Sequence, residues 1–219
     1  MNEIKKISIE NEEYPKLLKQ IYDPPKTLYI MGNEKLLNSL CIAIVGCRDV
    51  TEYGKKAATY FSYNLAKNDI TIVSGLAKGV DSFSHIGALE AKGKTIAVIG
   101  SGLDIIYPKE NLNLVNRIIK QDGAIISEYP LGTKPDRWHF PARNRIISGL
   151  SKAVLVVEAK EKSGSLITAD FAIEQGREVF AIPGNINSLN SMGTNKLIKD
   201  GAMPVLNFND ILSSVEFCQ

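Results

Sequence analysis

From residue 41 onward, short uninterrupted apolar runs alternate with longer segments in which apolar positions recur at helical spacing. Apolar runs without polar alternation are typical of strands buried on both faces, because helices then cover both sides of a parallel sheet. The pattern therefore predicts an α/β fold of the extended Rossmann-like, doubly wound type, with a mostly parallel sheet and helices on both faces. The predicted strands are 41–45, 71–73, 95–99, 124–126, 153–157 and 179–182.

The segments between these runs carry the periodicity of helices. Most of the predicted helices end at or just before a glycine, which can adopt the left-handed conformation that closes a helix. The glycines in question are Gly93, Gly123, Gly176 and Gly201. The predicted helices are 52–67, 81–92, 111–121, 166–176 and 192–199.

The first 38 residues do not follow this rhythm. They contain a short helical pattern at 14–21 and a turn followed by an extended piece at 23–32. A chain of 219 residues with 44% hydrophobic residues is large enough for one α/β core and too short for two full-sized domains. We therefore expect residues 1–38 to form a lead-in packed on the core as an extra sheet edge, and residues 39–219 to form the Rossmann-like domain.

Charge and cysteine usage narrow the possible partners. The net charge is only +2, so any anion site must come from local clustering of cations. Cys41, Cys47 and Cys218 are odd in number and lack metal-ligand spacing, which argues against zinc and disulfides. The start of the chain lacks the apolar core of a signal peptide, and no apolar run approaches the roughly 20 residues that span a bilayer. We expect a cytoplasmic protein without a membrane partner, a metal or another cofactor.

Ligands of open α/β sheets bind outside the carboxyl ends of the strands, so the loops after the predicted strands are the places to search. Glycines and hydroxyl residues in these loops allow a phosphate to approach the backbone and helix N-termini. Such residues occur in Gly46-Cys47-Arg48, Ser74-Gly75 and Ser163-Gly164-Ser165. The Gly100-Ser-Gly102 piece lacks the third glycine of a dinucleotide fingerprint and is interpreted as a tight turn, and the absence of a Walker A motif disfavours ATP hydrolysis.

The segment 128–152 concentrates cations and aromatic rings. Its basic residues are Lys134, Arg137, Arg143, Arg145 and Lys152, and they are interleaved with Trp138, His139 and Phe140. Arginine forks bind phosphate oxygens and aromatic faces stack on unpaired bases, so this composition favours single-stranded nucleic acid. In the alternative interpretation Trp138 and Phe140 belong to the core, and the arginines at the rim of the next predicted strand are oriented by ion pairs with Glu128 and Glu158.

Linked motifs along nearly the whole chain, from about residue 14 to 205, resemble the DNA-processing protein A family (DprA/Smf). The motifs are Gly46-x-Arg48, Ser74-Gly-x-Ala-x-Gly-Val-Asp81, Gly102-Leu-Asp-x-x-Tyr-Pro108, Phe140-Pro-x-Arg-Asn-Arg-Ile-Ile147, Ser163-Gly-Ser-Leu-Ile-Thr168 and Val179-Phe-Ala-Ile-Pro-Gly184. The resemblance implies a single-stranded DNA-binding protein that forms a homodimer, protects incoming DNA and loads the RecA recombinase during natural transformation or recombination. It implies no enzymatic turnover.

Matched residue by residue, the resemblance places phosphate contacts at Arg48 and Arg137 and a base pocket at Phe140. It also implies that Arg143, Asn144 and Arg145 line a DNA-binding groove. The backbone of the Ser163-Gly164-Ser165 turn would supply N–H donors at its edge. The complete set of expected DNA-binding residues is Gly46, Arg48, Ser74, Gly75, Arg137, Phe140, Arg143, Asn144, Arg145, Ser163, Gly164 and Ser165. Dimerisation is expected along residues 192–208, with Leu197, Ile198 and Leu206 as candidate contacts.

The chain departs from the family pattern at Cys47, where Ser or Thr is usual. A thiol is a weaker donor than a hydroxyl, which puts that phosphate contact in doubt. Beside Arg48 and a helix start, the thiol either packs in the interior or has a lowered pKa.

Two other functions of the same fold stay open from the sequence. One is an enzyme similar to nucleoside-monophosphate phosphoribohydrolases, with Glu128 and Glu158 as acid and nucleophile, although the Gly-Gly turn of those enzymes is absent. The other is a nucleotide-sensing module without turnover. His85 is interpreted as a core residue, and His139 as either a core or a functional residue.

Overall fold

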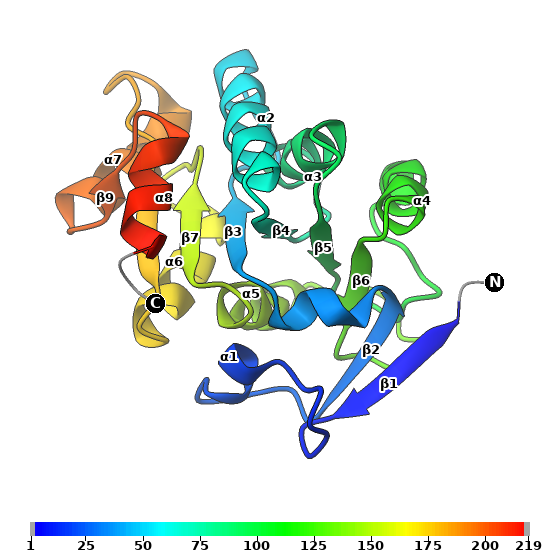
Figure 1. Cartoon of the computed structure of the whole chain (residues 1–219). Coiled ribbons are helices and arrows are strands. Elements are labelled where there is room, and N and C mark those ends of the chain that lie inside the picture. The colour runs from blue at the N-terminus through cyan, green and yellow to red at the C-terminus, as the bar shows by residue number, and fades with distance from the viewer. Residues whose placement is uncertain (1–2, 217–219) are drawn as a thin grey trace.

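The structure is a computed structural model that describes residues 3–216, and it contains a nine-stranded, mostly parallel sheet (Figure 1). The strand order is β1-β2-β6-β5-β4-β3-β7-β8-β9. All neighbours from β6 to β9 are parallel, whereas β1 and β2 pair antiparallel. The strands are β1 Ile4–Ser8, β2 Thr27–Gly32, β3 Cys41–Val45, β4 Thr71–Ser74, β5 Thr95–Val98, β6 Ala124–Ser127, β7 Ala153–Val156, β8 Glu178–Ala181 and β9 Met203–Pro204.

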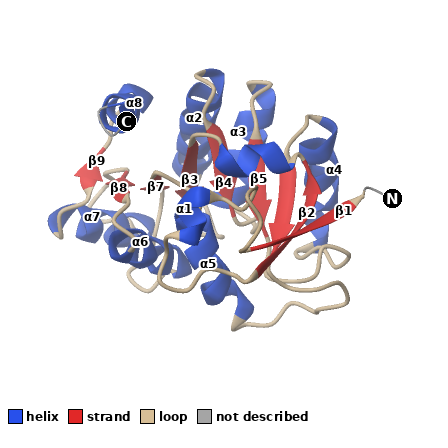
Figure 2. Ribbon diagram, turned by 60° about the horizontal axis from the view of Figure 1, so that its bottom comes forward, coloured by secondary structure: helices blue, strands red, loops and turns tan. Residues whose placement is uncertain are grey.

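Helices cover both faces of this sheet (Figures 1 and 2). Helices α2 (Glu52–Lys67), α3 (Val80–Glu90), α4 (Leu112–Lys120) and α8 (Phe208–Glu216) pack on one face. Helices α1 (Lys16–Lys19), α5 (His139–Gly149), α6 (Gly164–Glu174) and α7 (Met192–Lys199) pack on the other. Every residue of β3, β4, β5, β6 and β7 is buried, as the uninterrupted apolar runs require. The predicted fold class is confirmed.

The lead-in adds two strands to one edge of the sheet. β2 pairs with β6 in the register Tyr29↔Ser127, and β1 pairs with β2. Between them the buried Tyr14 donates a hydrogen bond from its hydroxyl to the carbonyl of Pro25 at 2.6 Å. The expectation of an extra edge is confirmed, and the division into residues 1–38 and 39–219 stays a prediction.

The sequence pattern missed two helices. Helix α5 spans His139–Gly149, where we expected the rim of a strand, and α8 lies beyond the last predicted element. The pattern of α5 is obscured because Arg143 lies on its buried side, so polar and apolar positions do not separate into two faces. This correction decides where the arginines of the motif point.

Cys41 and Cys47 are buried and free, and Cys218 lies outside the described residues. Across residues 3–216, every helix is too short or too polar to cross a bilayer.

Candidate nucleic-acid interface

A cavity of about 590 Å³ opens at the carboxyl ends of β3, β4 and β7. It lies where the loops after these three strands meet the first turns of α5 and α6. Of the twelve residues expected from the sequence, nine line it. These are Gly46, Arg48, Arg137, Phe140, Arg143, Asn144, Ser163, Gly164 and Ser165. Three of the four arginines expected at this edge of the sheet, Arg48, Arg137 and Arg143, therefore share one cavity.

Helix α5 sends its three consecutive polar residues in different directions, because neighbouring helical side chains diverge by about 100°. Arg143 faces the cavity. Asn144 lines the cavity and donates from Nδ2 to the carbonyl of Gly164 at 3.1 Å, which ties α5 to the start of α6. Arg145 points away from the cavity. An extended strand rim would not have produced this separation.

Arg143 is a buried cation at the floor of the cavity. Its Nε is buried and has no hydrogen-bond partner in the described part of the chain. Its guanidinium lies against Gly75, where any Cβ would overlap Nη1, and the carboxylate of Asp81 lies beside the same glycine. Burial lowers the pKa of Arg143, and Asp81 partly offsets this effect; burial also raises the pKa of Asp81, against the influence of Arg143. Arg143 and Asp81 thus each stabilise the charged form of the other beneath the cavity.

The structure places two of the expected DNA contacts, Arg145 and Ser74, outside the cavity. Arg145 forms an ion pair with Glu128 and donates from Nε to Asp23 Oδ2 at 3.0 Å, so it ties α5 to the lead-in and lines neither cavity of this region. Ser74 is fully buried and donates from Oγ to the carbonyl of Ile44 at 2.7 Å, which joins β4 to β3. The expectation that Glu128 orients an arginine is confirmed.

A smaller cavity of about 70 Å³ adjoins the first, and Gly75 lines it together with Arg48, Phe140 and Arg143. The Arg48 guanidinium lies 5.5 Å from the centroid of the Phe140 ring, and the centroids of the Tyr107 and Phe140 rings are 5.8 Å apart. Tyr107, which belongs to the motif that ends at Pro108, thus adds a second aromatic face to this part of the site. A cation and two rings are arranged here as in proteins that stack unpaired bases.

Trp138 lies at the rim of the site. Its side chain is 68% exposed, and the Arg137 guanidinium lies 4.7 Å from its ring centroid. The alternative in which Trp138 belongs to the core is wrong. The exposed ring is held by its neighbouring cation and presents a stacking face toward solvent.

The turn before α6 provides the opposite wall. Ser163 caps α6, and Gly164 at the first helical position has open space around it. A helix N-terminus favours anions through its free N–H groups and its dipole. Lys160 and Lys162 line the cavity beside this turn, and the sequence reasoning missed them although they directly precede the motif. The cations of the site therefore come from both walls.

Glu158 occupies the N-terminus of α2. Its carboxylate accepts hydrogen bonds from the backbone N–H and hydroxyl of Thr51, from the Cys47 thiol at 3.6 Å and from Asn190 Nδ2 at 3.4 Å. Within residues 3–214 it forms no ion pair with an arginine, so the expectation that Glu158 orients Arg143 or Arg145 is wrong. It instead fixes the loop that carries Arg48.

The Cys47 thiol is not activated. Burial and the neighbouring Glu158 carboxylate raise the pKa of Cys47 to about 12, so the alternative with a lowered pKa is wrong. The thiol donates toward Glu158 and toward the carbonyl of Asp49 at 3.3 Å. At neutral pH it is a neutral donor within the loop.

The two histidines differ in place. His85 is fully buried in α3 and donates from Nδ1 to Thr95 Oγ1 at 2.7 Å. Burial lowers the pKa of His85 to about 3. The expectation that His85 is a core residue is confirmed. The direction of this hydrogen bond follows because the Thr95 hydroxyl already donates to the carbonyl of Ile72. His139 stacks on Tyr129 at 4.0 Å, with Nδ1 3.1 Å from the carbonyl of Gly100.

Residues 5–216 match the model of the DNA recombination-mediator protein A family. The chain belongs to this family. It is 48% identical over 213 residues to DNA processing protein DprA of Bacillus subtilis, covering 97% of this chain and 71% of that protein. It is 46% identical over 211 residues to protein Smf of Escherichia coli, covering 96% of this chain and 56% of that protein. The resemblance seen in the motifs is confirmed.

Solved structures of family members have the same fold. DNA processing protein A from Streptococcus pneumoniae superposes with a TM-score of 0.92 at 47% identity, over 96% of this chain and 74% of that one. DNA processing protein A from Helicobacter pylori, whose structure addresses its single-stranded DNA binding mode, gives a TM-score of 0.86 at 36% identity, over 98% of each chain. A molybdenum cofactor binding protein from Rippkaea orientalis shares the fold alone, with a TM-score of 0.58 at 16% identity over 82% of this chain and 97% of that one.

Proposed function

We propose that this protein binds single-stranded DNA in the cavity at the carboxyl edge of the sheet, without chemical turnover. The observation that carries the proposal is that Arg48, Arg137 and Arg143 line one cavity with the Phe140 ring. Phosphates and unpaired bases require this combination of forked cations and an aromatic face. The family relative from Helicobacter pylori, with the same fold, is a single-stranded DNA-binding protein.

Each part of the site has a distinct role in this proposal. Arg48 and Arg137 are exposed and would contact the sugar-phosphate chain. Arg143 is buried and places its cation at the floor of the cavity, and its Nε has no hydrogen-bond partner within residues 3–216. Phe140 and Tyr107 flank the space next to Arg48, where a base would stack. The start of α6 supplies N–H donors on the opposite wall.

The geometry gives little support to the phosphoribohydrolase alternative. Glycoside cleavage needs two carboxyl groups free to act as acid and nucleophile. Here Glu128 is held by Arg145, and Glu158 accepts hydrogen bonds from Thr51, Cys47 and Asn190. Assay of the common nucleoside monophosphates for released ribose phosphate, with a Glu158→Gln control, tests this alternative directly.

We further propose the partners implied by the family. A homodimer would use residues 192–208, where Leu206 is exposed and Leu197 and Ile198 are partly buried. RecA would be loaded onto the bound strand during transformation or recombination. Sedimentation velocity of Leu206→Glu tests the dimer face, and RecA filament formation on strands bound by this protein tests the loading.

The decisive experiment for DNA binding is a salt titration with a single-stranded oligonucleotide. Three to five phosphate contacts give a slope of about −2 to −3.5 in the logarithm of the binding constant against the logarithm of salt concentration. Duplex DNA of the same sequence provides the comparison. Absence of binding at low salt would refute the proposal.

A further inference from the structure

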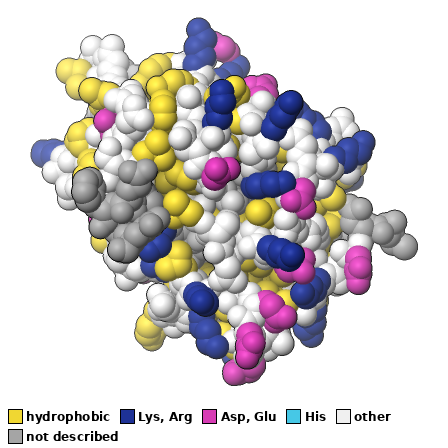
Figure 3. All heavy atoms as spheres, in the orientation of Figure 1, with side chains coloured by type: hydrophobic (Ala, Val, Ile, Leu, Met, Phe, Trp, Pro, Cys, Tyr) yellow, Lys and Arg dark blue, Asp and Glu magenta, His cyan; other side chains and the backbone are white. Residues whose placement is uncertain are grey.

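A second groove lies on the other side of the β3–α2 loop, between α2 and the loops that follow β8 and β9. Its volume is about 340 Å³. Figure 3 shows hydrophobic side chains gathered along the border between α2 and α8. Two tyrosines on its α2 side are substantially exposed, Tyr53 at 53% and Tyr60 at 43%. The groove is lined by Tyr53, Lys56, Ala57, Tyr60, Phe61, Ile182, Pro183, Val205 and Leu206.

Helix geometry places an aromatic ring, a cation and a second ring on one face of α2. Tyr53, Lys56 and Tyr60 occupy positions i, i+3 and i+7, which share a helix face. The rise of α2 separates the two tyrosines by about 10 Å along the axis. The opposite face of the helix, with Ala58 and Leu65, is packed in the core. Tyr60 also packs edge-on against Phe208 of α8, with 6.1 Å between the ring centroids, and still remains 43% exposed.

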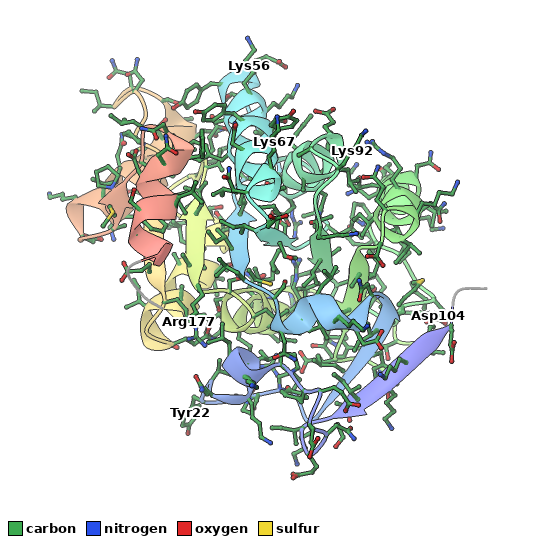
Figure 4. All side chains as sticks on the ribbon, viewed as in Figure 1. Tyr22, Lys56, Lys67, Lys92, Asp104 and Arg177 are labelled. Atoms are coloured by element: carbon green, nitrogen blue, oxygen red, sulfur yellow. The ribbon has the colours of Figure 1, made fainter. Side chains whose placement is uncertain are left out.

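The charge on this face is available to a ligand. Lys55 forms an ion pair with Glu52, whereas Lys56 forms none with the side chains of residues 3–214. Figure 4 shows Lys56 projecting from α2 on the side of the sheet opposite Tyr22. An unpaired cation between two exposed rings suits a phosphate flanked by stacked bases.

The loop that carries Arg48 leads directly into α2, which forms one wall of the second groove, although the two hollows share no lining residue. Thr51 caps α2 three residues after Arg48, and Tyr53 lies in the first turn of the same helix. Its hydroxyl donates to the carbonyl of Pro183 at 3.3 Å, which holds the ring at the mouth of the groove. We propose that a single strand leaving the Arg48 cavity runs along α2, stacking bases on Tyr53 and Tyr60 with a phosphate at Lys56. This inference rests on the proposed function.

The test compares a short oligonucleotide of about 6 nucleotides with a long one of about 20, which reaches beyond one binding site. Tyr53→Ala/Tyr60→Ala should weaken binding of the long oligonucleotide by roughly 30-fold or more and leave the short one unchanged. Tyr53→Phe/Tyr60→Phe keeps the rings and should retain affinity, which separates stacking from damage to the fold. Lys56→Ala should reduce the salt slope for the long oligonucleotide by about 0.7.

Matched controls lie outside both the cavity and the second groove. Tyr22→Ala removes a fully exposed ring, and Lys120→Ala removes an exposed cation from α4; neither should distinguish the two oligonucleotides. If Arg48→Ala weakens both lengths while the α2 variants weaken neither, the α2 inference fails and the proposed function stands. If the wild type binds neither length, the proposed function itself fails.

A second copy of the chain is the other candidate occupant of the groove. Sedimentation velocity of the α2 variants should show the wild-type oligomeric state. Loss of long-strand affinity accompanied by dissociation would assign the groove to the second copy and overturn the inference.

Discussion

Arg145 and Glu128 form a bidentate ion pair in which Nη1 donates to Oε1 at 2.8 Å and Nη2 donates to Oε2 at 2.7 Å. Their side chains are only 11% and 16% exposed. The pair joins α5 to the end of β6, and Arg145 also reaches the carbonyl of Asp23 in the lead-in. Arg145, which the family resemblance placed in the DNA-binding groove, therefore holds α5 against β6 and the lead-in.

Removal of one partner should destabilise the fold without a specific effect on DNA. Arg145→Ala leaves Glu128 largely buried without its cation, and we expect a loss of about 3 kcal/mol in the free energy of unfolding, measured by urea denaturation. The slope of DNA affinity against salt should equal that of the wild type. Joint replacement by Arg145→Met and Glu128→Leu should restore most of the stability. A reduced salt slope in Arg145→Ala would return this residue to the interface.

Arg48→Ala should weaken oligonucleotide binding by about 1 to 3 kcal/mol for every base composition, because a phosphate contact does not identify bases. The salt slope should become shallower by about 0.7. Arg117→Ala is the matched control, since Arg117 is exposed in the last turn of α4. Equal salt slopes for the two variants would contradict the placement of the groove.

Phe140→Ala should cost about 1 to 3 kcal/mol of binding free energy through lost stacking. Unlike Arg48→Ala, it should leave the salt slope unchanged, because no phosphate contact is removed. Fluorescence anisotropy at several salt concentrations separates the two effects. An unaltered affinity would show that bases do not stack at this ring.

Gly75→Ala should act through Arg143. A Cβ at this position would overlap Nη1 of Arg143 and lie 2.6 Å from Asp81 Oδ2, so the guanidinium must move. We expect DNA binding to weaken by about 1.5 to 3 kcal/mol, the value of a hydrogen bond to a charged group. The double variant with Arg143→Ala should bind as Arg143→Ala does, because both changes remove the same contact. Additive losses would mean that Gly75 contacts DNA independently.

His85 should make the protein sensitive to acid. Its pKa is lowered by burial from 6.5 to about 3, so between these values the unfolded chain binds a proton that the folded chain does not. The contribution of neutral His85 to the free energy of unfolding is therefore fully present above pH 6.5. The free energy of unfolding falls as the pH decreases toward 3, by up to about 1.4 kcal/mol per pH unit. Urea midpoints from pH 7 to 4.5 measure this slope. His85→Leu should flatten it, and an unchanged slope would locate the acid sensitivity elsewhere.

The sheet could be predicted from sequence because its strands are buried on both faces, as in Cys41–Val45, which leaves an uninterrupted apolar signal. The cavity could be predicted because loops after parallel strands meet at one edge. The directions of Arg143 and Arg145 could not, since they depend on α5 being a helix. The hydrogen bonds of Glu158 also escaped prediction, because Thr51 and Asn190 come from distant parts of the chain. The two-residue strand β9 gives no periodic signal at all.

The carboxylate of Glu158 at the start of α2 also limits where a bound strand can place its phosphates. The protein supplies its own anion to the positive end of that helix, so a phosphate near Arg48 meets the arginine side chain and gains nothing from the α2 dipole. The start of α6 has no such internal acid. At the wall with Lys160 and Lys162, both backbone N–H groups and side chains therefore attract an incoming phosphate chain. At the Arg48 wall only side chains attract it. Added salt should therefore release the chain from the Arg48 wall first.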